Sequence, residues 1–398
     1  MSDTTAFETL AADFYGFEDA LSEQERGLVM GLREYLDREV RPVVDEHWER
    51  AEFPRAIVDG LARAGAVGLG FEETRPFENS AVFRGWTALE LARVDASVAT
   101  YVGVQNGLAL GSIGICGSAE QRAEWLPKLA SGEVVGSFGL TEPLSGSDSA
   151  QGLATTARFD EAAGEWVLNG SKRWIGNATF GDITVIWAKD EADGQVKGFI
   201  VPNASEGFTA TKIERKTALR IVQNADIELR DVRVPASAKL EHANSFRDTA
   251  SVLRQTRAEV AWLATGIAVG AYEAALAYAT ERIQFGKPIA KHQMIQDHLV
   301  TCLGNITSSI ALCVRVSEML DAGTQRDEHS ALAKAVATSR MRETVALARE
   351  VCGGNGIVAD YGVGRFFADA EAIYSYEGTR EMNTLIVGRA ITGQAAFV

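Results

Sequence analysis

Two short runs decide the fold of this 398-residue chain: Thr155-Thr156-Ala157-Arg158-Phe159 and, after the turn Asp160 to Gly164, Glu165-Trp166-Val167-Leu168-Asn169. They are alternating runs rich in Val, Thr and Trp, a pattern typical of strands. Four more runs follow, at Ile183 to Ala188, Val196 to Val201, Phe208 to Ile213 and Ile227 to Val234. A spacing of about ten residues without helices between the runs predicts an antiparallel sheet or barrel rather than β-α-β units.

Helical patterns precede this strand-rich region. Ser22-Glu23-Gln24-Glu25 is a capping box, and leucines and valines then recur at helical spacing as far as Trp48, so we expect a helix that Pro42 bends. Ser118 with Gln121 should cap another helix.

Long helices are also expected after the strands. The patterns place them at Asp248 to Phe285, Gln293 to Leu320 and Glu328 to Val351, with a fourth opening near Thr379. Short connections between them imply a bundle. We therefore predict a helical N-terminal domain over residues 1–135, a central antiparallel β-domain over 136–244 and a C-terminal four-helix bundle over 245–398.

Composition argues against several classes of function. A net charge of −15 and a pI near 5.0 disfavour a nucleic-acid partner, because phosphate binding depends on Lys and Arg. The four cysteines and five histidines form no C-x-x-C or H-E-x-x-H motif, so neither a metal site nor a redox dithiol is expected. Scattered cysteines of this kind suit buried free thiols in a reducing compartment.

Targeting signals are not expected either. Residues 1–21 carry five acidic side chains and no Lys or Arg, unlike a transit or signal peptide, so we predict a cytoplasmic protein. The run from Ala96 to Ala119 is free of charges and long enough to cross a membrane, but its polar residues and five glycines favour a buried helix pair. We expect no membrane association.

The strongest motif lies where the chain enters the strand region, from Phe138 to Asp148. Its glycines expose backbone donors and its Thr and Ser residues add hydroxyls, a set suited to a polar heterocycle or a phosphate, although a hydrophilic turn is the simpler interpretation. Trp174 could stack on a flat ring or simply fill the core. Arg282 could bind a pyrophosphate. The glycine-rich run Cys352 to Gly356 follows a helix and not a strand, so it fails as a dinucleotide-binding fingerprint.

One carboxylate, Glu377, lies in the apolar and aromatic stretch from Ile373 to Thr379. Burial there should disfavour the charged form and bring the group towards a general base. The simpler interpretation is a solvated charge near a helix N-terminus. The seven residues alone leave both possibilities open.

These blocks, in this order and at this spacing, resemble the acyl-CoA dehydrogenases from about Ser22 to the end of the chain, with the greatest likeness to the branch of the glutaryl-CoA dehydrogenases and the plant short-chain acyl-CoA oxidase. The resemblance implies FAD held between the β-domain and the bundle, an acyl-CoA substrate, and electron-transferring flavoprotein or oxygen as the acceptor. It also implies a homotetramer or a related dimer-based assembly.

The resemblance also implies individual roles. Residues lining the flavin would be Phe138, Gly139, Leu140, Thr141, Gly146, Ser147, Trp174, Ile175 and Gly176, with Thr379 touching FAD. Residues serving the cofactor across a subunit interface would be Arg282, Gln293, Glu350, Val351, Cys352, Gly353 and Gly354. Substrate contacts would come from Ser147, Arg257, Gly378 and Phe397. Glu377 would take the α-proton while the β-hydride passes to flavin N5, which gives a trans-2-enoyl-CoA.

The sequence departs from the family pattern at two positions. Ala99 stands where glutaryl-CoA dehydrogenases carry an arginine for the distal carboxylate, which favours a plain short or medium acyl chain. Gly176 replaces the usual Thr or Ser near flavin N5, as in the plant oxidase, so an oxidase is the main alternative. A helical binding protein without catalysis is the remote one; it would be expected to lack the base.

Overall fold

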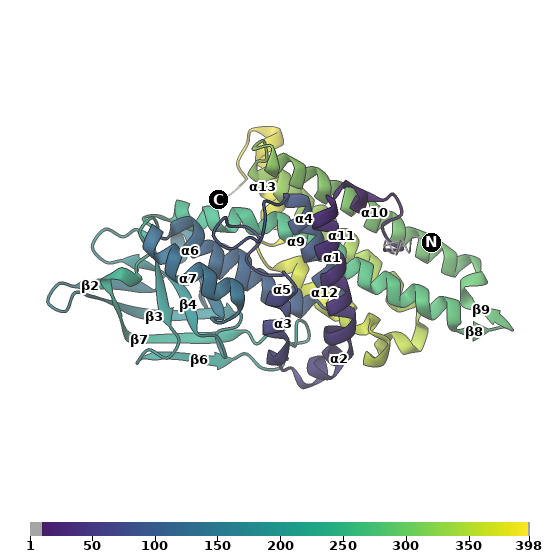
Figure 1. Ribbon diagram of the computed structural model, residues 1–398, viewed down its shortest axis with the longest axis horizontal. Coiled ribbons are helices and arrows are strands. Elements are labelled where there is room, and N and C mark those ends of the chain that lie inside the picture. The colour runs from purple at the N-terminus through teal and green to yellow at the C-terminus, as the bar shows by residue number, and fades with distance from the viewer. Residues whose placement is uncertain (1–9, 397–398) are drawn as a thin grey trace, which may run out of the picture. The chain divides into compact units, whose positions relative to one another are not determined.

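The structure is a computed structural model that describes residues 10–396 and divides into two compact units (Figure 1). Within the described residues, one unit comprises 10–49, 79–99 and 257–396, and the other comprises 50–78 and 100–256. We call them the helical unit and the sheet unit. The three domains expected from the sequence, divided at 135 and 244, stay a prediction.

The sheet unit is built on seven strands in the order β1-β4-β2-β3-β7-β6, with β5 paired to β4. Most pairs are antiparallel, as expected, but β4 runs parallel to both β1 and β2. The strands are β1 (Gly136–Gly139), β2 (Thr156–Asp160), β3 (Glu165–Ile175), β4 (Ile183–Asp190), β5 (Val196–Pro202), β6 (Phe208–Lys212) and β7 (Ala225–Pro235). All six expected strands are therefore present, and β1 at the entrance to the motif is an addition.

The same unit contains several helices. They are α3 (Val58–Arg63), a π-helical segment (Val104–Leu110), α6 (Gly111–Cys116), α7 (Ala119–Ser131) and the short α8 (Ser149–Gly152). Of these, the π-helical segment, α6 and α7 pack on the sheet. One buried cluster joins Ile113 and Leu126 of the helices to Val185 and Trp187 of β4. The capping box predicted at Ser118 and Gln121 is present at the start of α7.

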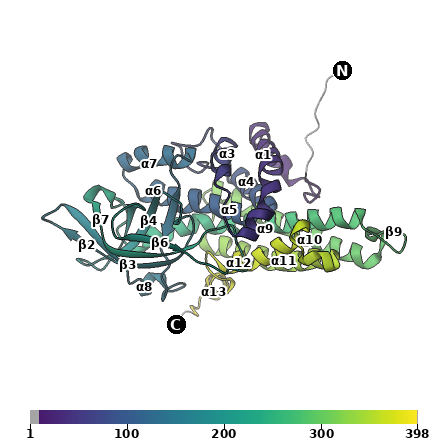
Figure 2. The ribbon, with the colours of Figure 1, turned by 90° about the horizontal axis from the view of Figure 1, so that it is seen from below.

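The helical unit contains the long helices of the C-terminal half. They are α9 (Phe246–Glu281), which begins in the sheet unit, α10 (Gln293–Asp321), α11 (Asp327–Val351), α12 (Val363–Ser375) and α13 (Arg380–Thr392). Figure 2 shows α10 and α12 beside α11. The prediction missed α12, and the first helix ends at Glu281 rather than Phe285, because a small hairpin of β8 (Ile283–Gln284) and β9 (Lys287–Pro288) follows it.

The N-terminal helices of this unit are α1 (Glu23–Tyr35), α2 (Arg41–Arg50), α4 (Ala81–Val94) and α5 (Ala96–Gly103), of which α5 runs on into the sheet unit. The capping box of Ser22 and Glu25 is confirmed at α1. A π-helical segment, Leu36–Val40, lies between α1 and α2 just before Pro42. The helix type thus changes just before Pro42, and the bend expected there stays a prediction.

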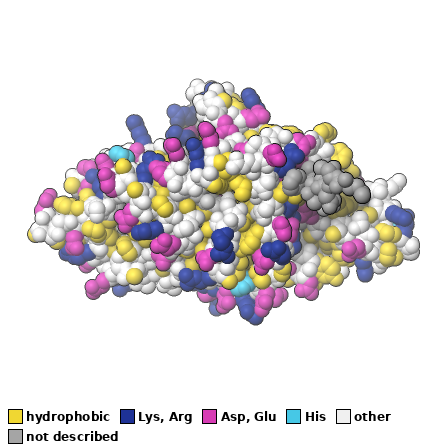
Figure 3. Space-filling model, viewed as in Figure 1, with side chains coloured by type: hydrophobic (Ala, Val, Ile, Leu, Met, Phe, Trp, Pro, Cys, Tyr) yellow, Lys and Arg dark blue, Asp and Glu magenta, His cyan; other side chains and the backbone are white. Residues whose placement is uncertain are grey.

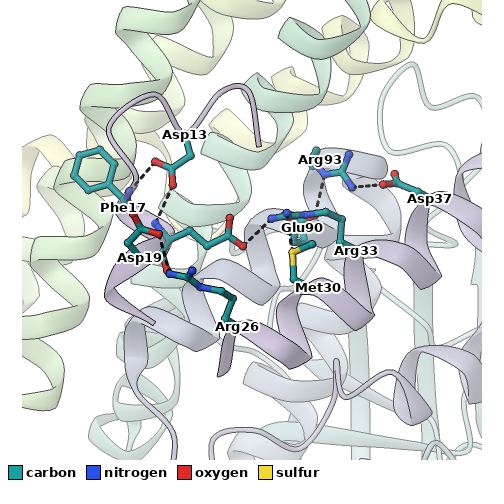
Figure 4. A network of polar contacts seen from close by, with 10 residues as sticks. Asp13, Phe17, Asp19, Arg26, Met30, Arg33, Asp37, Glu90 and Arg93 are labelled. Atoms are coloured by element: carbon teal, nitrogen blue, oxygen red, sulfur yellow. Dashed lines mark hydrogen bonds and ion pairs between the residues drawn. The ribbon is translucent and has the colours of Figure 1, made fainter. Parts of the chain in front are cut away.

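A chain of buried charges ties α1 to α4 (Figure 4). Glu90 is fully buried on α4 and accepts hydrogen bonds from Arg33 at 2.7 and 3.0 Å and from Arg93 at 2.8 Å. The same arginines reach Glu18 at 2.9 Å and Asp37 at 2.8 Å. Because a buried charge without partners is costly, the network fixes how these two helices pack.

Among the described residues, two helices, α9 and α10, are long and apolar enough to span a membrane by length and composition alone. The apolar window of α9 is 78% buried within the protein, whereas that of α10 is 39% buried. The four cysteines are free and buried, as expected.

Candidate active site

The turn between α12 and α13 presents Glu377 in a strained backbone conformation. Glu377 has φ 54° and Gly378 has φ 85°, so two consecutive residues are left-handed. The next residue, Thr379, caps α13, and its hydroxyl accepts the Met382 N–H at 3.2 Å. A left-handed residue other than glycine costs about 1–3 kcal/mol and persists only when its surroundings hold it.

The buried ammonium of Lys334 on α11 holds this turn. Its Nζ donates to the carbonyl oxygens of Tyr374 at 3.3 Å and of Tyr376 at 2.7 Å, and also to that of Gly378. Burial lowers the pKa of Lys334 to about 8, against the attraction of the Glu377 carboxylate. One cation therefore fixes the backbone on both sides of Glu377.

A second carboxyl group, that of Glu259 on α9, interacts electrostatically with Glu377. Burial raises the pKa of Glu259 to about 7, the negative charge of Glu377 adds to the effect, and the guanidinium of Arg84 on α4 opposes it. Arg84 also donates to the Asn79 side chain at 2.7 Å. The sequence analysis missed both Glu259 and Lys334, although each is a single charge on an apolar helix face.

In the sheet unit, a buried ion pair shapes the loop that begins at Phe138. The Nζ of the fully buried Lys172 donates to Glu142 at 2.8 Å, to the Trp187 carbonyl at 2.7 Å and to the Leu140 carbonyl at 3.2 Å. Glu142 also accepts the N–H groups of residues 154 and 155 at 2.6 and 2.9 Å. Lys172 and Glu142 thus hold the loop in place, and the sequence analysis singled out neither of them.

The structure brings two of the predicted flavin-lining segments together within this unit. The Arg173 N–H donates to the Thr141 carbonyl at 2.8 Å, which joins the loop to the end of β3. The next residue, Trp174, has φ 66° and is 51% exposed, so it is not core filler. Its indole is a flat, accessible surface beside the hydroxyl-rich loop.

Other predicted flavin residues contribute differently. Phe138, Leu140 and Ile175 have buried side chains in the clusters packed on the sheet, so only their backbone groups are available to a cofactor. Gly146 and Ser147 are exposed, and a Cβ atom on Gly146 would meet nothing within 4 Å. Gly139 is different, because a Cβ there would lie 2.6 Å from the Ile186 side chain.

The residues expected to serve the cofactor across an interface gather at one end of the bundle. Gln293 begins α10, and Glu350 near the end of α11 lies 3.6 Å from the His298 side chain of α10. Val351 and Cys352 are buried, whereas Gly353 and Gly354 are exposed. Arg282 follows the last residue of α9.

This end of the bundle is remote from Glu377. Arg257 and Glu377 both act electrostatically on Lys334. Arg257 is separated from Arg282 by 25 positions along the helix, or about 37 Å at 1.5 Å per residue. The predicted site residues of the helical unit therefore form two groups. The last one, Phe397, lies outside the described residues.

Comparisons with known proteins cover most of the chain. Family models for the N-terminal, middle and C-terminal domains of acyl-CoA dehydrogenases match residues 22–133, 137–232 and 246–392. The mitochondrial short-chain specific acyl-CoA dehydrogenase of Mus musculus is 32% identical over 372 residues, which cover 92% of this chain and 90% of that protein.

Two solved structures are similar to this chain over nearly its full length. Glutaryl-CoA dehydrogenase from Mycobacterium smegmatis in complex with FADH2 has a TM-score of 0.93 and 34% identity, covering 98% of this chain and 100% of that one. Butyryl-CoA dehydrogenase from Megasphaera elsdenii has a TM-score of 0.88 and 29% identity, covering 93% and 98%.

Proposed function

We propose that this chain, which belongs to the acyl-CoA dehydrogenase family, oxidises an acyl-CoA with a short or medium straight chain to the trans-2-enoyl-CoA. The chain is an FAD-dependent oxidoreductase with the three-part fold of the family. Its relatives include glutaryl-CoA and short-chain acyl-CoA dehydrogenases. The proposal concerns the length of the acyl chain, the roles of individual residues and the electron acceptor.

The observation that carries the proposal is the way Glu377 is held. Lys334 and the left-handed backbone fix the carboxyl-bearing residue in one orientation, which suits a base that must reach a single α-hydrogen. An acyl chain that fills the site would expel water and strengthen the base. The neighbouring Gly378 leaves room for a thioester, because a Cβ there would meet only the Asn383 side chain at 3.4 Å.

The residues of the sheet unit fit FAD. Trp174 offers an exposed ring for stacking, and the loop at Thr141 and Ser147 offers hydroxyl and backbone groups for a polar heterocycle. FAD supplies the hydride acceptor when it is bound. The buried pair of Lys172 and Glu142 would keep this loop in shape before and after the cofactor enters.

A monocarboxylic acyl chain is the proposed substrate. Ala99 is buried at the position where the family's glutaryl enzymes place an arginine, and Glu259 adds a further carboxyl group near the base. A distal carboxylate would thus gain no cation from Ala99. Turnover of glutaryl-CoA at the rate of butyryl-CoA or hexanoyl-CoA would refute this choice.

The decisive experiment is an anaerobic chain-length series. Wild type loaded with FAD should lose its yellow colour fastest with one short or medium acyl-CoA, and Glu377→Gln should stay folded and yellow without bleaching. Retained bleaching in Glu377→Gln would assign the base elsewhere. A purified protein that takes up no FAD would favour the non-catalytic binding protein.

An oxidase is the second candidate, and Gly176 is the observation that favours it. A Cβ atom at Gly176 would lie 3.4 Å from Val104 and 3.7 Å from Val222, so a side chain would fit and the glycine leaves space instead. Such space could admit oxygen to the flavin. Mixing the reduced enzyme with air separates the two, because fast reoxidation with peroxide supports the oxidase and slow reoxidation supports transfer to an electron-transferring flavoprotein.

An assembly of several subunits is also proposed. Arg282 lies about 37 Å along α9 from Arg257, so a cofactor near Glu377 is out of its reach in the same chain and would need another copy. Exposed apolar side chains surround that end of the bundle, with Phe285 93% exposed and Met294 74% exposed. A homotetramer is the expected state, and light scattering of the FAD-loaded protein would test it.

The remaining partners follow from charge. On the face seen in Figure 3, Lys and Arg side chains are interspersed with Asp and Glu, which supports the expectation that nucleic acid is not a partner. The cytoplasmic location stays a prediction.

A further inference from the structure

Thr141 carries two hydrogen-bond donors that the described part of the chain does not use. Among the described residues, neither its N–H nor its hydroxyl has a hydrogen-bond partner, and its carbonyl oxygen accepts the Arg173 N–H at 2.8 Å. Thr141 is partly exposed, and the residue after Arg173 is Trp174, whose ring is half exposed. Both donors therefore belong to an accessible residue at the place proposed for the flavin.

The peptide bond before Thr141 is held from the core by Lys172. The Nζ of this fully buried residue of β3 donates to the Leu140 carbonyl oxygen at 3.2 Å. The Leu140 carbonyl and the Thr141 N–H belong to one planar trans peptide, in which the two groups point in opposite directions. Because the ammonium group lies on the carbonyl side, the Thr141 N–H points away from this buried cation.

The charge of Lys172 is costly where it lies. Burial lowers the pKa of Lys172 to about 8, against the attraction of the Glu142 carboxylate. The ammonium group donates to Glu142 and to two carbonyl oxygens, those of Trp187 and Leu140. Apolar side chains of similar size are often as stable as a buried ion pair, or more stable. Stability alone therefore does not explain a cation at the Leu140 carbonyl.

A cation bound to a carbonyl oxygen strengthens the N–H of the same peptide as a donor. Hydrogen bonds in a chain polarise one another, and the low dielectric of the interior makes each bond stronger. Here the chain runs from the Lys172 ammonium through the Leu140 carbonyl to the Thr141 N–H. An acceptor atom bound by Thr141 would thus receive part of the effect of a buried positive charge without touching the lysine.

We propose that Lys172 is a positioning residue that acts on the flavin through the Leu140–Thr141 peptide and makes the site bind reduced FAD more tightly, relative to oxidised FAD. This rests on the proposed place of the flavin at Thr141. Two-electron reduction adds negative charge to the acceptor atoms of the flavin ring, so a strengthened donor stabilises the reduced form more than the oxidised one. The consequence for the proposed reaction is a flavin that accepts a hydride more readily.

A redox titration of the FAD-loaded protein without acyl-CoA tests this. A reference dye reports the potential of the bound flavin, and the affinity for oxidised FAD then gives the affinity for reduced FAD. Lys172→Met keeps the apolar stem without the charge. Its preference for reduced over oxidised FAD should fall by about tenfold, which is about 30 mV for a two-electron couple. An equal loss of affinity for both forms, or an unchanged preference, would overturn the proposal, because Lys172 would then only shape the loop.

Lys189 of β4 provides a matched control. It also lies on a strand of the sheet and donates to a backbone carbonyl, that of Gln151 in α8 at 3.1 Å. Lys189→Met should leave the preference for reduced FAD unchanged. A fall equal to that of Lys172→Met would show a general effect of net charge and contradict the role of the peptide.

A second variant covers the case in which Lys172→Met does not fold because Glu142 has lost its cation. Lys172→Met with Glu142→Gln replaces the ion pair by neutral side chains of similar size. The preference for reduced FAD should fall in the same direction, since the Leu140 carbonyl again lacks its cationic donor. An unchanged preference in this variant would also overturn the proposal.

Hydrogen exchange gives a readout that needs neither reduction nor substrate. FAD binding should slow the exchange of the Thr141 N–H, measured by mass spectrometry with fragmentation that resolves single residues. An exchange rate that FAD does not change would place the flavin elsewhere and refute the proposal. Neither experiment uses acyl-CoA, so both decide the role of Lys172 even where no acyl-CoA bleaches the flavin and the proposed dehydrogenation fails.

Discussion

Replacing Glu259 by Gln should change how the stability of the protein depends on pH. Burial and the charge of Glu377 raise the pKa of Glu259 from 4.5 to about 7 in the folded state. The folded protein therefore holds this proton more tightly than the unfolded chain does. The stability that the proton contributes is fully present below pH 4.5 and is lost as the pH rises through about 7.

The size of the effect follows from the same two values. The difference between 4.5 and about 7 corresponds to about 3 kcal/mol at 1.4 kcal/mol per pH unit, all of it lost above pH 8. Gln has nearly the same shape and cannot ionise, so the variant should escape this loss. Any constant cost of the substitution itself drops out when the two proteins are compared across pH.

Thermal unfolding of the FAD-saturated proteins at pH 5, 6, 7 and 8 measures this. For a chain of this length 1 kcal/mol corresponds to about 1–2 °C, extrapolated from smaller domains. The melting temperature of Glu259→Gln should thus rise relative to wild type by about 3–5 °C between pH 5 and pH 8. The exposed Glu133 provides the control, since Glu133→Gln should show a constant difference. A constant difference for Glu259→Gln as well would refute the reasoning.

Three further substitutions probe the packing of the helical unit. Lys334→Met keeps the apolar stem but removes the donors to three carbonyl oxygens, at about 1–3 kcal/mol for each one left buried; the melting temperature should fall, flavin bleaching should slow at least tenfold, and unchanged bleaching would contradict the holding role. Gly85→Ala brings a Cβ to 2.1 Å from Trp262 and should cost about 1–3 kcal/mol in a melting experiment, whereas Gly27→Ala, with nothing within 4 Å, should be neutral or stabilising. Glu90→Gln weakens the charge-assisted hydrogen bonds from Arg33 and Arg93 and should cost about 1–3 kcal/mol; a loss below 1 kcal/mol would show that the other carboxylates of the network compensate.

Local patterns predicted most of the fold because they act over a few residues. The capping boxes at Ser22 and Ser118 join residues three positions apart, and the alternation of the runs from Thr155 onwards can be recognised within each run; the structure confirms both. The parallel pairing of β4 with β1 and β2 joins distant segments, and no local pattern records such a partner. Helix α12 was missed, although its sequence directly follows the glycine-rich segment after α11.

The candidate site shows the same division. Glu377 and Trp174 were predicted through a resemblance in sequence, and the structure adds the strained backbone of one and the exposed ring of the other. Lys334 and Glu259 act through partners on other helices. A lone charge on an apolar helix face indicates that it has a partner, but only the packing of the helices shows which residue that partner is.

The left-handed backbone at Glu377 sets a limit on how this protein can be improved in the laboratory. Glycine at this position would relieve the strain of φ 54° and is a natural stabilising change. A selection that rewards heat resistance alone would therefore favour variants that discard the carboxylate. Libraries selected for thermostability need an activity screen at every round, because replacing the proposed base by glycine would stabilise the fold.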